Sequence, residues 1–310
     1  MKSIPPLGIA VTFCIMSFLY DLSAQPSYPP ELPDAKTFTY KKVGNTELQA
    51  WAFFPQDLKK SDRRPAVVFF FGGGWRSGSP VQFEKQCQYL ASRGLVALTA
   101  DYRVLNRHGT KATTCVEDGK SAVRWIRQTA AKLGVDPSRV AAGGGSAGGH
   151  VAASLGTIDA FEAKGENHKI SSRPDALLLF NPALVLADIG TKLKIPEERK
   201  AGMRERIGTE PRALSPYHHL NEHLPPTLIF HGTKDTTVPF RTADLFHRKA
   251  KKLGLPCQLV PSKDMPHGFF NWGRFDNLPF IETMLATDRF LSDLGWLSGK
   301  PTINEFVDSF

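Results

Sequence analysis

The sequence predicts an α/β protein with a mostly parallel central sheet and helices on both of its faces. Short apolar runs without polar alternation recur along the chain, which is typical of strands that are buried on both faces. Stretches with helical periodicity separate these runs, and this alternation favours a parallel sheet. The chain has 310 residues, of which 41% are hydrophobic and 22% are charged, so it can bury one full core.

Two strands of alternating polarity open the folded part of the chain. Residues 37–41 and 48–54 alternate like edge strands, and Gly44-Asn45 forms a turn between them. The runs that we expect as buried strands are 66–71, 95–100, 140–142, 176–180, 227–230 and 257–260. The stretches that we expect as helices are 81–92, 114–133, 147–156, 242–253 and 281–293. An insertion of about 45 residues before the strand at 227–230, with a charged helical stretch at 196–207, predicts a small lid over about 184–224.

The beginning of the chain predicts a secretory signal peptide over residues 1–24. Lys2 supplies a positive charge, residues 7–20 form an apolar run, and Ser23-Ala24 ends this run with small side chains. The run has fourteen residues, whereas a span of the bilayer needs roughly 20. We therefore expect cleavage after Ala24, a single domain over residues 25–310, and a secreted or periplasmic protein without stable membrane insertion.

The charge balance predicts a basic surface. The formal net charge is +9, but the Lys and Arg residues are scattered, and no DNA- or RNA-binding motif accompanies them. We therefore expect a solvated basic surface and no nucleic-acid partner. Attraction toward an acidic polymer or a membrane face is the alternative.

The cysteines allow one disulfide in an oxidising compartment. Removal of residues 1–24 takes away Cys14 and leaves Cys87, Cys115 and Cys257. This odd count permits one bridge and one free thiol, and Cys87–Cys115 is the first pair to test. Three buried thiols are the alternative.

A serine lies in a glycine-rich turn between an expected strand and an expected helix. Residues 144–148 read Gly-Gly-Ser-Ala-Gly, which is the pattern G-x-S-x-G around Ser146. In a strand–turn–helix context the flanking glycines allow a tight turn that exposes the serine Oγ. The start of the following helix also favours a developing negative charge. Ser146 is therefore the expected nucleophile.

A serine nucleophile needs a base, and the base needs an acid that orients it, in the chain order Ser, Asp or Glu, His. His267 follows the last expected strand and is the expected base. Asp235 lies in the loop after the strand at 227–230 and is the expected acid, while Asp264 is the rival because it is close to His267 in the chain. His150 lies on the nucleophile's own helix, and we expect it to pack beneath the site.

A second glycine cluster follows the strand expected at 66–71. Residues 71–75 read Phe-Gly-Gly-Gly-Trp. They have neither the Lys-Ser/Thr ending of a phosphate-binding loop nor the spacing of a dinucleotide site. The stretch resembles the HGGG oxyanion loop of lipases and esterases. From about Ala66 to His267 the chain resembles α/β-hydrolases of the hormone-sensitive-lipase and bacterial acetyl-esterase type. Further matching stretches are Asp101-Tyr102-Arg103, Asp118, Arg124-Trp125 and Ser215-Pro216.

This resemblance implies the α/β-hydrolase fold and an oxyanion hole. The donors that it implies are the backbone N–H groups of Gly73, Gly74 and Ala147. One departure concerns Phe71, because the family has a histidine there that helps to hold the loop. The donors belong to the main chain and survive this change, so we still expect catalysis.

These residues predict an exported serine ester hydrolase that works through an acyl-enzyme. Resemblance to lightly capped exported esterases implies short acyl groups, acetyl or feruloyl, on carbohydrates or small esters. A serine peptidase related to the catalytic domain of prolyl oligopeptidases is one alternative, although its usual propeller domain does not fit into 310 residues. A non-catalytic binding protein with the same fold is the other alternative. We expect no cofactor and no metal.

Overall fold

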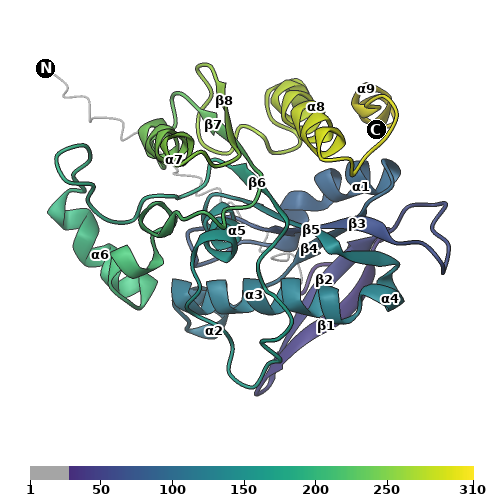
Figure 1. Ribbon diagram of the computed structural model, residues 1–310, viewed down its shortest axis with the longest axis horizontal. Helices are drawn as coiled ribbons and strands as arrows, with labels where there is room; N and C mark the ends of the chain where they lie inside the picture. The colour runs from purple at the N-terminus through teal and green to yellow at the C-terminus, as the bar shows by residue number, and fades with distance from the viewer. Residues whose placement is uncertain (1–27) are drawn as a thin grey trace, which may run out of the picture. The chain divides into compact units, whose positions relative to one another are not determined.

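An eight-stranded sheet forms the centre of the computed structural model, which describes residues 28–310. The strand order is β1-β2-β4-β3-β5-β6-β7-β8 (Figure 1). The strands are β1 Lys36–Val43, β2 Thr46–Phe53, β3 Arg64–Phe70, β4 Val96–Ala100, β5 Val135–Gly145, β6 Ala176–Phe180, β7 Thr227–Gly232 and β8 Cys257–Ser262. The β1–β2 and β2–β4 pairs are antiparallel, and the pairs from β4 onward are parallel. The signal peptide expected at residues 1–24 lies outside the described residues.

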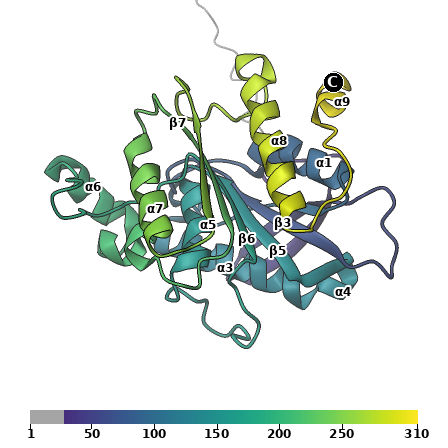
Figure 2. The same ribbon diagram turned by 45° about the horizontal axis from the view of Figure 1, so that its top comes forward.

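Helices cover both faces of the sheet, as the sequence predicts (Figures 1 and 2). The helices are α1 Glu84–Ser92, α2 Leu105–His108, α3 Ala112–Gln128, α4 Ala130–Leu133, α5 Ala147–Thr157, α6 Glu197–Ile207, α7 Phe240–Lys252, α8 Leu278–Asp293 and α9 Ile303–Asp308. Helices α1, α8 and α9 contribute to the core layer on one face, and α3, α5 and α7 to the layer on the other. Among residues 28–310, none of the helices has the length and apolar character of a membrane span.

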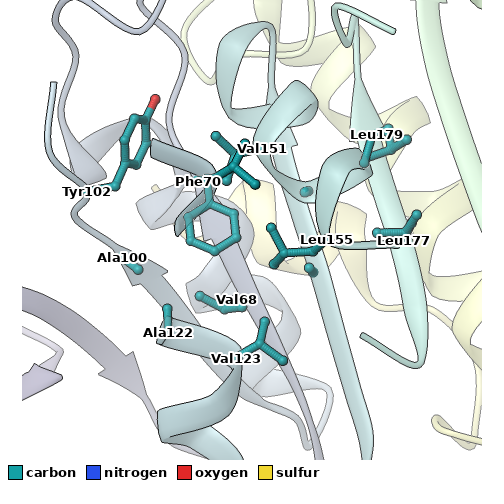
Figure 3. Close-up of a cluster of buried hydrophobic side chains, with 14 of the residues drawn as sticks. Val68, Phe70, Ala100, Tyr102, Ala122, Val123, Val151, Leu155, Leu177 and Leu179 are labelled. Carbon is teal, nitrogen blue, oxygen red and sulfur yellow. The ribbon is translucent and has the colours of Figure 1, made fainter. Parts of the chain in front are cut away.

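The central strand β3 fills both layers of the core. Successive side chains of a strand point to opposite faces, so an unbroken apolar run supplies both sides. Val68 and Phe70 contribute to the layer that contains α3 and α5, and Figure 3 shows them near Val151 of α5. Val67 and Phe69 contribute to the layer that contains α1 and α8. The prediction of a mostly parallel sheet buried on both faces is therefore confirmed.

Two local features differ from the sequence prediction. The stretch expected as one helix at 114–133 forms two helices, α3 and α4, which separate at Thr129. The Thr129 hydroxyl donates to the Trp125 carbonyl oxygen one turn back, a bond that competes with regular helix geometry. Helices α2 and α9 were not predicted because a helix of one or two turns shows too little periodicity.

The Cys87–Cys115 bridge is absent, and within the described residues the three cysteines are free, buried thiols. Cys87 lies on α1 in one core layer, whereas Cys115 lies on α3 in the layer across the sheet. A disulfide needs Cα atoms within about 7 Å of each other, which is less than the thickness of a sheet with a helix on each face. The alternative of three buried thiols is the one that the fold realises.

The insertion between β6 and β7 contains the expected charged helix, α6. Two short 3-10 helices, η2 Pro211–Leu214 and η3 Pro216–His219, follow it. Ser215 lies between these two, and its Oγ accepts a hydrogen bond from the Leu186 N–H at 3.0 Å, which joins the end of the insertion to its beginning. We call residues 184–224 the lid.

Candidate active site

Ser146 lies in a strained turn between β5 and α5. Its backbone angles are φ 54° and ψ −115°, in a region that non-glycine residues rarely adopt. The glycines around it are required by close packing. A Cβ on Gly144 would lie 2.5 Å from the Phe70 carbonyl oxygen, and a Cβ on Gly148 would collide with the same atom. The G-x-S-x-G pattern therefore reflects the close approach of this turn to β3.

The structure joins His267 to Asp235. His267 Nδ1 donates to Asp235 Oδ2 at 2.6 Å, and the aspartate side chain is fully buried while that of His267 is 24% exposed. Asp235 Oδ1 accepts hydrogen bonds from the N–H groups of Thr237 and Val238, at 2.9 and 2.8 Å. This arrangement fixes the imidazole so that Nδ1 carries a proton and Nε2 is free to act as a base.

The Asp235 carboxylate is held in its ionised form. Burial alone would raise the pKa of this carboxyl, but hydrogen bonds from His231 and His267 and from the Val238 N–H lower it below its ordinary value. His231 Nε2 lies 3.4 Å from Asp235 Oδ2 and 2.7 Å from the Val238 carbonyl oxygen. His231 was not predicted as part of this network, although its place four residues before Asp235 at the end of a strand was visible in the sequence.

The rival acid, Asp264, lies elsewhere. Its side chain is 55% exposed and forms an ion pair with Lys234 at 3.1 Å. No hydrogen bond between Asp264 and His267 occurs in the part of the chain that the structure describes. Proximity in the chain therefore does not bring this carboxylate to the imidazole.

Two backbone N–H groups in the glycine loop have no acceptor within residues 28–310. These are the N–H groups of Gly73 and Gly74. The Ala147 N–H at the start of α5 also has no acceptor there. The preceding residue differs, because the Gly72 N–H donates to Gln82 Oε1 at 2.6 Å. The loop thus presents free donors in the form that an oxyanion hole needs.

The loop is anchored around Phe71 without the family's histidine. The Phe71 ring is buried and stacks on Tyr102, with centroids 4.2 Å apart. The Tyr102 hydroxyl donates to the Phe71 carbonyl oxygen at 2.6 Å. Aromatic stacking and one side-chain hydrogen bond therefore hold the beginning of the loop.

His150 anchors the end of the loop. As expected, it is buried on α5 beneath the site. The Trp75 indole N–H donates to His150 Nδ1 at 3.2 Å, and His150 Nε2 donates to the Leu214 carbonyl oxygen at 2.7 Å. Burial lowers the pKa of His150 to about 4, although the bond to Leu214 opposes this shift. One neutral imidazole thus connects the glycine loop, the nucleophile helix and the lid.

Two clefts meet at Ser146. The first, which we call the histidine cleft, has a volume of about 570 Å³ and is lined by Ser146, His267, the glycine loop and polar side chains that include Gln82, Asn271 and Arg274. The second, which we call the lid pocket, has a volume of about 510 Å³ and is also lined by Ser146 and Gly74. Its other walls are mostly apolar side chains of the lid and its surroundings: Val185, Leu186, Leu193, Ile195, Met203 and Val238.

The structure therefore brings the predicted nucleophile, base, acid and oxyanion donors into one region. Ser146 and His267 line the same cleft, and Asp235 lies behind His267. Within residues 28–310 no group of three or more His, Cys, Asp or Glu side chains is placed to hold a metal ion. The arrangement can perform acyl transfer through a covalent serine intermediate.

Comparison with known proteins identifies a family and several relatives. Residues 53–250 match the BD-FAE family model. The solved structure of Thermogutta terrifontis esterase 2 phosphonylated by sarin is 53% identical, with a TM-score of 0.86, over 88% of this chain and 100% of that chain. The butyrate-bound structure of the same esterase is 53% identical, with a TM-score of 0.85, over 89% of this chain and 100% of that one.

Curated relatives are more distant. Carboxylesterase NlhH of Mycobacterium tuberculosis is 31% identical over 142 residues, which are 45% of this chain and 43% of that protein. The acetylxylan esterase of Xylanibacter ruminicola is 27% identical over 282 residues, which are 87% of this chain and 52% of that protein. The chain thus spans about half the length of the curated relatives it matches. The Thermogutta structures confirm the predicted α/β-hydrolase fold. Together with the curated relatives they support the predicted class, a serine hydrolase of the carboxylesterase type.

Proposed function

Because the chain belongs to the BD-FAE family, we propose that it hydrolyses carboxylic esters through an acyl-enzyme on Ser146. The observation that carries this proposal is the Asp235–His267 hydrogen bond behind a cleft that His267 shares with a strained serine. Sarin phosphonylates the Thermogutta esterase, and such a reaction requires a strong nucleophile, which a serine beside a base provides.

The reaction follows from the positions of these groups. His267 Nε2 takes the proton of the Ser146 hydroxyl as Oγ bonds to the ester carbonyl carbon. The resulting oxyanion accepts hydrogen bonds from the N–H groups of the glycine loop and α5. His267 then gives its proton to the leaving alcohol, the carbon–oxygen bond breaks, and the acyl group stays on Ser146. Water, activated by the same imidazole, releases the acid and restores the serine.

The two clefts divide the substrate between them. The leaving oxygen must lie within reach of His267. His267 lines the histidine cleft but not the lid pocket. The alcohol therefore occupies the histidine cleft, where amide and guanidinium groups can bind hydroxyl groups. The acyl group occupies the lid pocket, where apolar side chains remove it from water.

Short acyl groups, acetyl or feruloyl, on a carbohydrate or a small ester are the substrates that we propose. The propionate- and butyrate-bound Thermogutta structures support short acyl groups, and the acetylxylan esterase supports acetyl groups on a carbohydrate. The polar walls of the histidine cleft fit a sugar whose hydroxyl group carries the acyl group. From the signal-peptide pattern at residues 1–24 we further propose that the protein is secreted or periplasmic.

A substrate panel tests the function. Purified protein is assayed on 4-nitrophenyl acetate, butyrate and octanoate, on acetylated and feruloylated xylo-oligosaccharides, and on a proline anilide, with Ser146→Ala as the inactive control. We expect hydrolysis of the short esters and no cleavage of the anilide. Cleavage of the anilide alone would make the protein a peptidase, and turnover of nothing in the panel would favour a binding protein.

A further inference from the structure

A third groove, which we call the cationic groove, lies between the lid and α7 and has a volume of about 590 Å³. Five of its eight lining residues are basic, and none is acidic. The five are Lys192 of the lid and Arg241, Arg248, Lys249 and Lys252 of α7. The sequence predicted scattered basic charge, but the fold collects part of it in one concave site.

Most of this charge is uncompensated. Arg248 Nε forms an ion pair with Asp244 at 2.9 Å. Arg241 and Lys249 donate only to backbone carbonyl oxygens, those of Lys192 and Tyr217, each at 2.7 Å. Lys192 and Lys252 have no carboxylate partner within residues 28–310. Four cations therefore face the groove without an opposing charge, and their mutual repulsion is relieved when an anion binds.

Burial and the neighbouring Arg212 guanidinium both lower the pKa of Lys249. This direction agrees with a cluster of like charges that lacks a counterion. The Lys249 ammonium also lies 4.7 Å from the centroid of the Tyr217 ring, so the cation is held in place against the groove wall.

The other three residues that line the groove are aromatic or aliphatic. They are Tyr217, Leu245 and Leu253, and Leu253 is 50% exposed. Aromatic and aliphatic side chains beside cations suit a partly apolar ring that carries anionic substituents. A sugar ring with a carboxylate or sulfate group has this character, since its C–H face packs on apolar side chains and its anion pairs with Arg and Lys.

The cationic groove adjoins the lid pocket. Lys192 lines the groove while Leu193 and Ile195 line the pocket, and on α7 Arg241 lines the groove while Thr242 lines the pocket. The bond from Arg241 to the Lys192 carbonyl oxygen joins the two segments of this shared wall. The proposed function puts the alcohol of the substrate in the histidine cleft, so a polymer that also reached the groove would place there a stretch other than the sugar that carries the ester.

We propose that the cationic groove is a binding site for an anionic polysaccharide, which it holds beside the active site. The proposal rests on the proposed esterase function for the identity of the polymer, but binding can be measured without turnover. Removal of groove charge should weaken retention of the polymer and leave the hydrolysis of a small ester unchanged.

Two double variants with equal charge change provide the test. Lys192→Gln/Lys252→Gln removes two exposed groove cations whose side chains form no hydrogen bond or ion pair in the described structure. Lys59→Gln/Lys60→Gln removes two exposed cations from the loop between β2 and β3. Affinity electrophoresis and calorimetry measure binding to polygalacturonate, a sulfated galactan and neutral arabinoxylan. Single-stranded DNA and phosphatidylserine vesicles serve as other polyanions.

We expect the wild type and the loop variant to bind an anionic polysaccharide equally, and the groove variant to bind it about tenfold more weakly. If polygalacturonate binds more tightly than the sulfated galactan, the recognised group is a carboxylate. If the sulfated galactan binds more tightly, it is a sulfate. Equal losses in the two variants, equal affinity for arabinoxylan, or binding of only DNA or vesicles would overturn the proposal.

A kinetic measurement separates this inference from the proposed function. On acetylated polygalacturonate the groove variant should have a higher KM and an unchanged kcat, while its kcat/KM for 4-nitrophenyl acetate should equal that of the wild type. Binding without hydrolysis of any ester would leave the groove in place and refute the esterase proposal. Hydrolysis of esters without groove-dependent binding would support the esterase proposal and refute the groove proposal.

Discussion

The Trp75 indole donates a hydrogen bond to His150 Nδ1 at 3.2 Å and thereby ties the glycine loop to the helix behind the nucleophile. Trp75 has φ 61°, an unfavourable angle for a large side chain. The residue is buried, with 6% of its surface exposed. The bond to His150 helps to stabilise this conformation. Trp75 directly follows Gly74, one of the two glycines of the loop whose N–H groups are free.

Trp75→Phe should lower kcat about tenfold, a barrier change of roughly 1.4 kcal/mol, with little change in KM. Phenylalanine keeps an aromatic ring but cannot donate to His150, so the loop loses the constraint that directs its N–H groups. Steady-state kinetics on 4-nitrophenyl acetate measure the effect. Trp125→Phe, on α3, is the matched control and should keep wild-type kinetics. A Trp75→Phe enzyme with normal kcat would show that the bond has no part in catalysis.

Stability should fall in acid because of His150. Burial lowers its pKa in the folded protein to about 4 from the ordinary 6.5. Between these two pH values the unfolded chain binds a proton that the folded chain does not, so the free energy of unfolding decreases as the pH falls. The loss from this group approaches about 3 kcal/mol near pH 4. Urea unfolding at pH 7, 6, 5 and 4.5 measures it.

His150→Gln is the control for this pH dependence. It should be less stable than the wild type at pH 7, because it cannot keep both the Trp75 and the Leu214 bonds in the same geometry. Its free energy of unfolding should then depend less steeply on pH between 6.5 and 4.5. Equal slopes in the two proteins would assign the acid sensitivity to other groups.

The catalytic residues are tested by substitution and labelling. Ser146→Ala and His267→Ala should each lower kcat by about 10⁴-fold or more, and Asp235→Asn should have a similar or somewhat smaller effect. Asp264→Asn should be harmless, because this residue pairs with Lys234 at the surface. Paraoxon phosphorylates the Thermogutta esterase, and in this protein mass spectrometry should find the adduct on Ser146. Damage from Asp264→Asn without damage from Asp235→Asn would reverse the acid assignment.

The sequence predicted those features that depend on local pattern. Buried parallel strands such as β6 are continuous apolar runs, and a serine between glycines at a strand–helix junction is a local motif. The order of Ser146, Asp235 and His267 in the chain, with each after a strand, was enough to place all three at the same edge of a parallel sheet, where the structure has them.

Other features depend on contacts between distant segments, which periodicity does not reveal. Nothing in the sequence near Cys87 or Cys115 tells which face of the sheet each helix covers, so the sequence could not decide between a Cys87–Cys115 bridge and the three buried thiols that the structure has. The bond between Trp75 and His150 joins residues 75 positions apart. The cationic groove likewise combines Lys192 of the lid with α7, and only the fold brings these segments together.

Export is tested at the N-terminus of the mature protein. An apolar run that ends in Ser23-Ala24 suits signal peptidase, so secreted or periplasmic protein should begin near Gln25. N-terminal sequencing of the native protein checks this. Exported material that still contains residues 7–20 would refute the cleavage prediction, and retention of the full chain in the cytoplasm would refute export.

The glycine loop offers a direct test of the oxyanion hole. Gly74 has φ +63°, and a Cβ added there would have only the Arg206 guanidinium within 4 Å, at 3.8 Å. Gly74→Val therefore strains the backbone and displaces the N–H without a clash in the core. The loss of one donor typically costs 10²–10³ in kcat, roughly 2.7–4 kcal/mol. Gly73→Val should be at least as damaging, because its Cβ would collide with the Ser77 carbonyl oxygen.

Phe71→Leu is the contrasting variant in this loop. It removes the stacking on Tyr102 but keeps an apolar side chain and the main-chain bond from the Tyr102 hydroxyl. Activity should stay within about tenfold of the wild type, a change of roughly 1.4 kcal/mol in the barrier. Thermal melts must show that each variant is folded, since valine restricts the angles that glycine allows. If folded Gly74→Val keeps a normal kcat, the loop is not the oxyanion hole; if Phe71→Leu is as inactive as Gly74→Val, aromatic stacking rather than the free donors limits the rate.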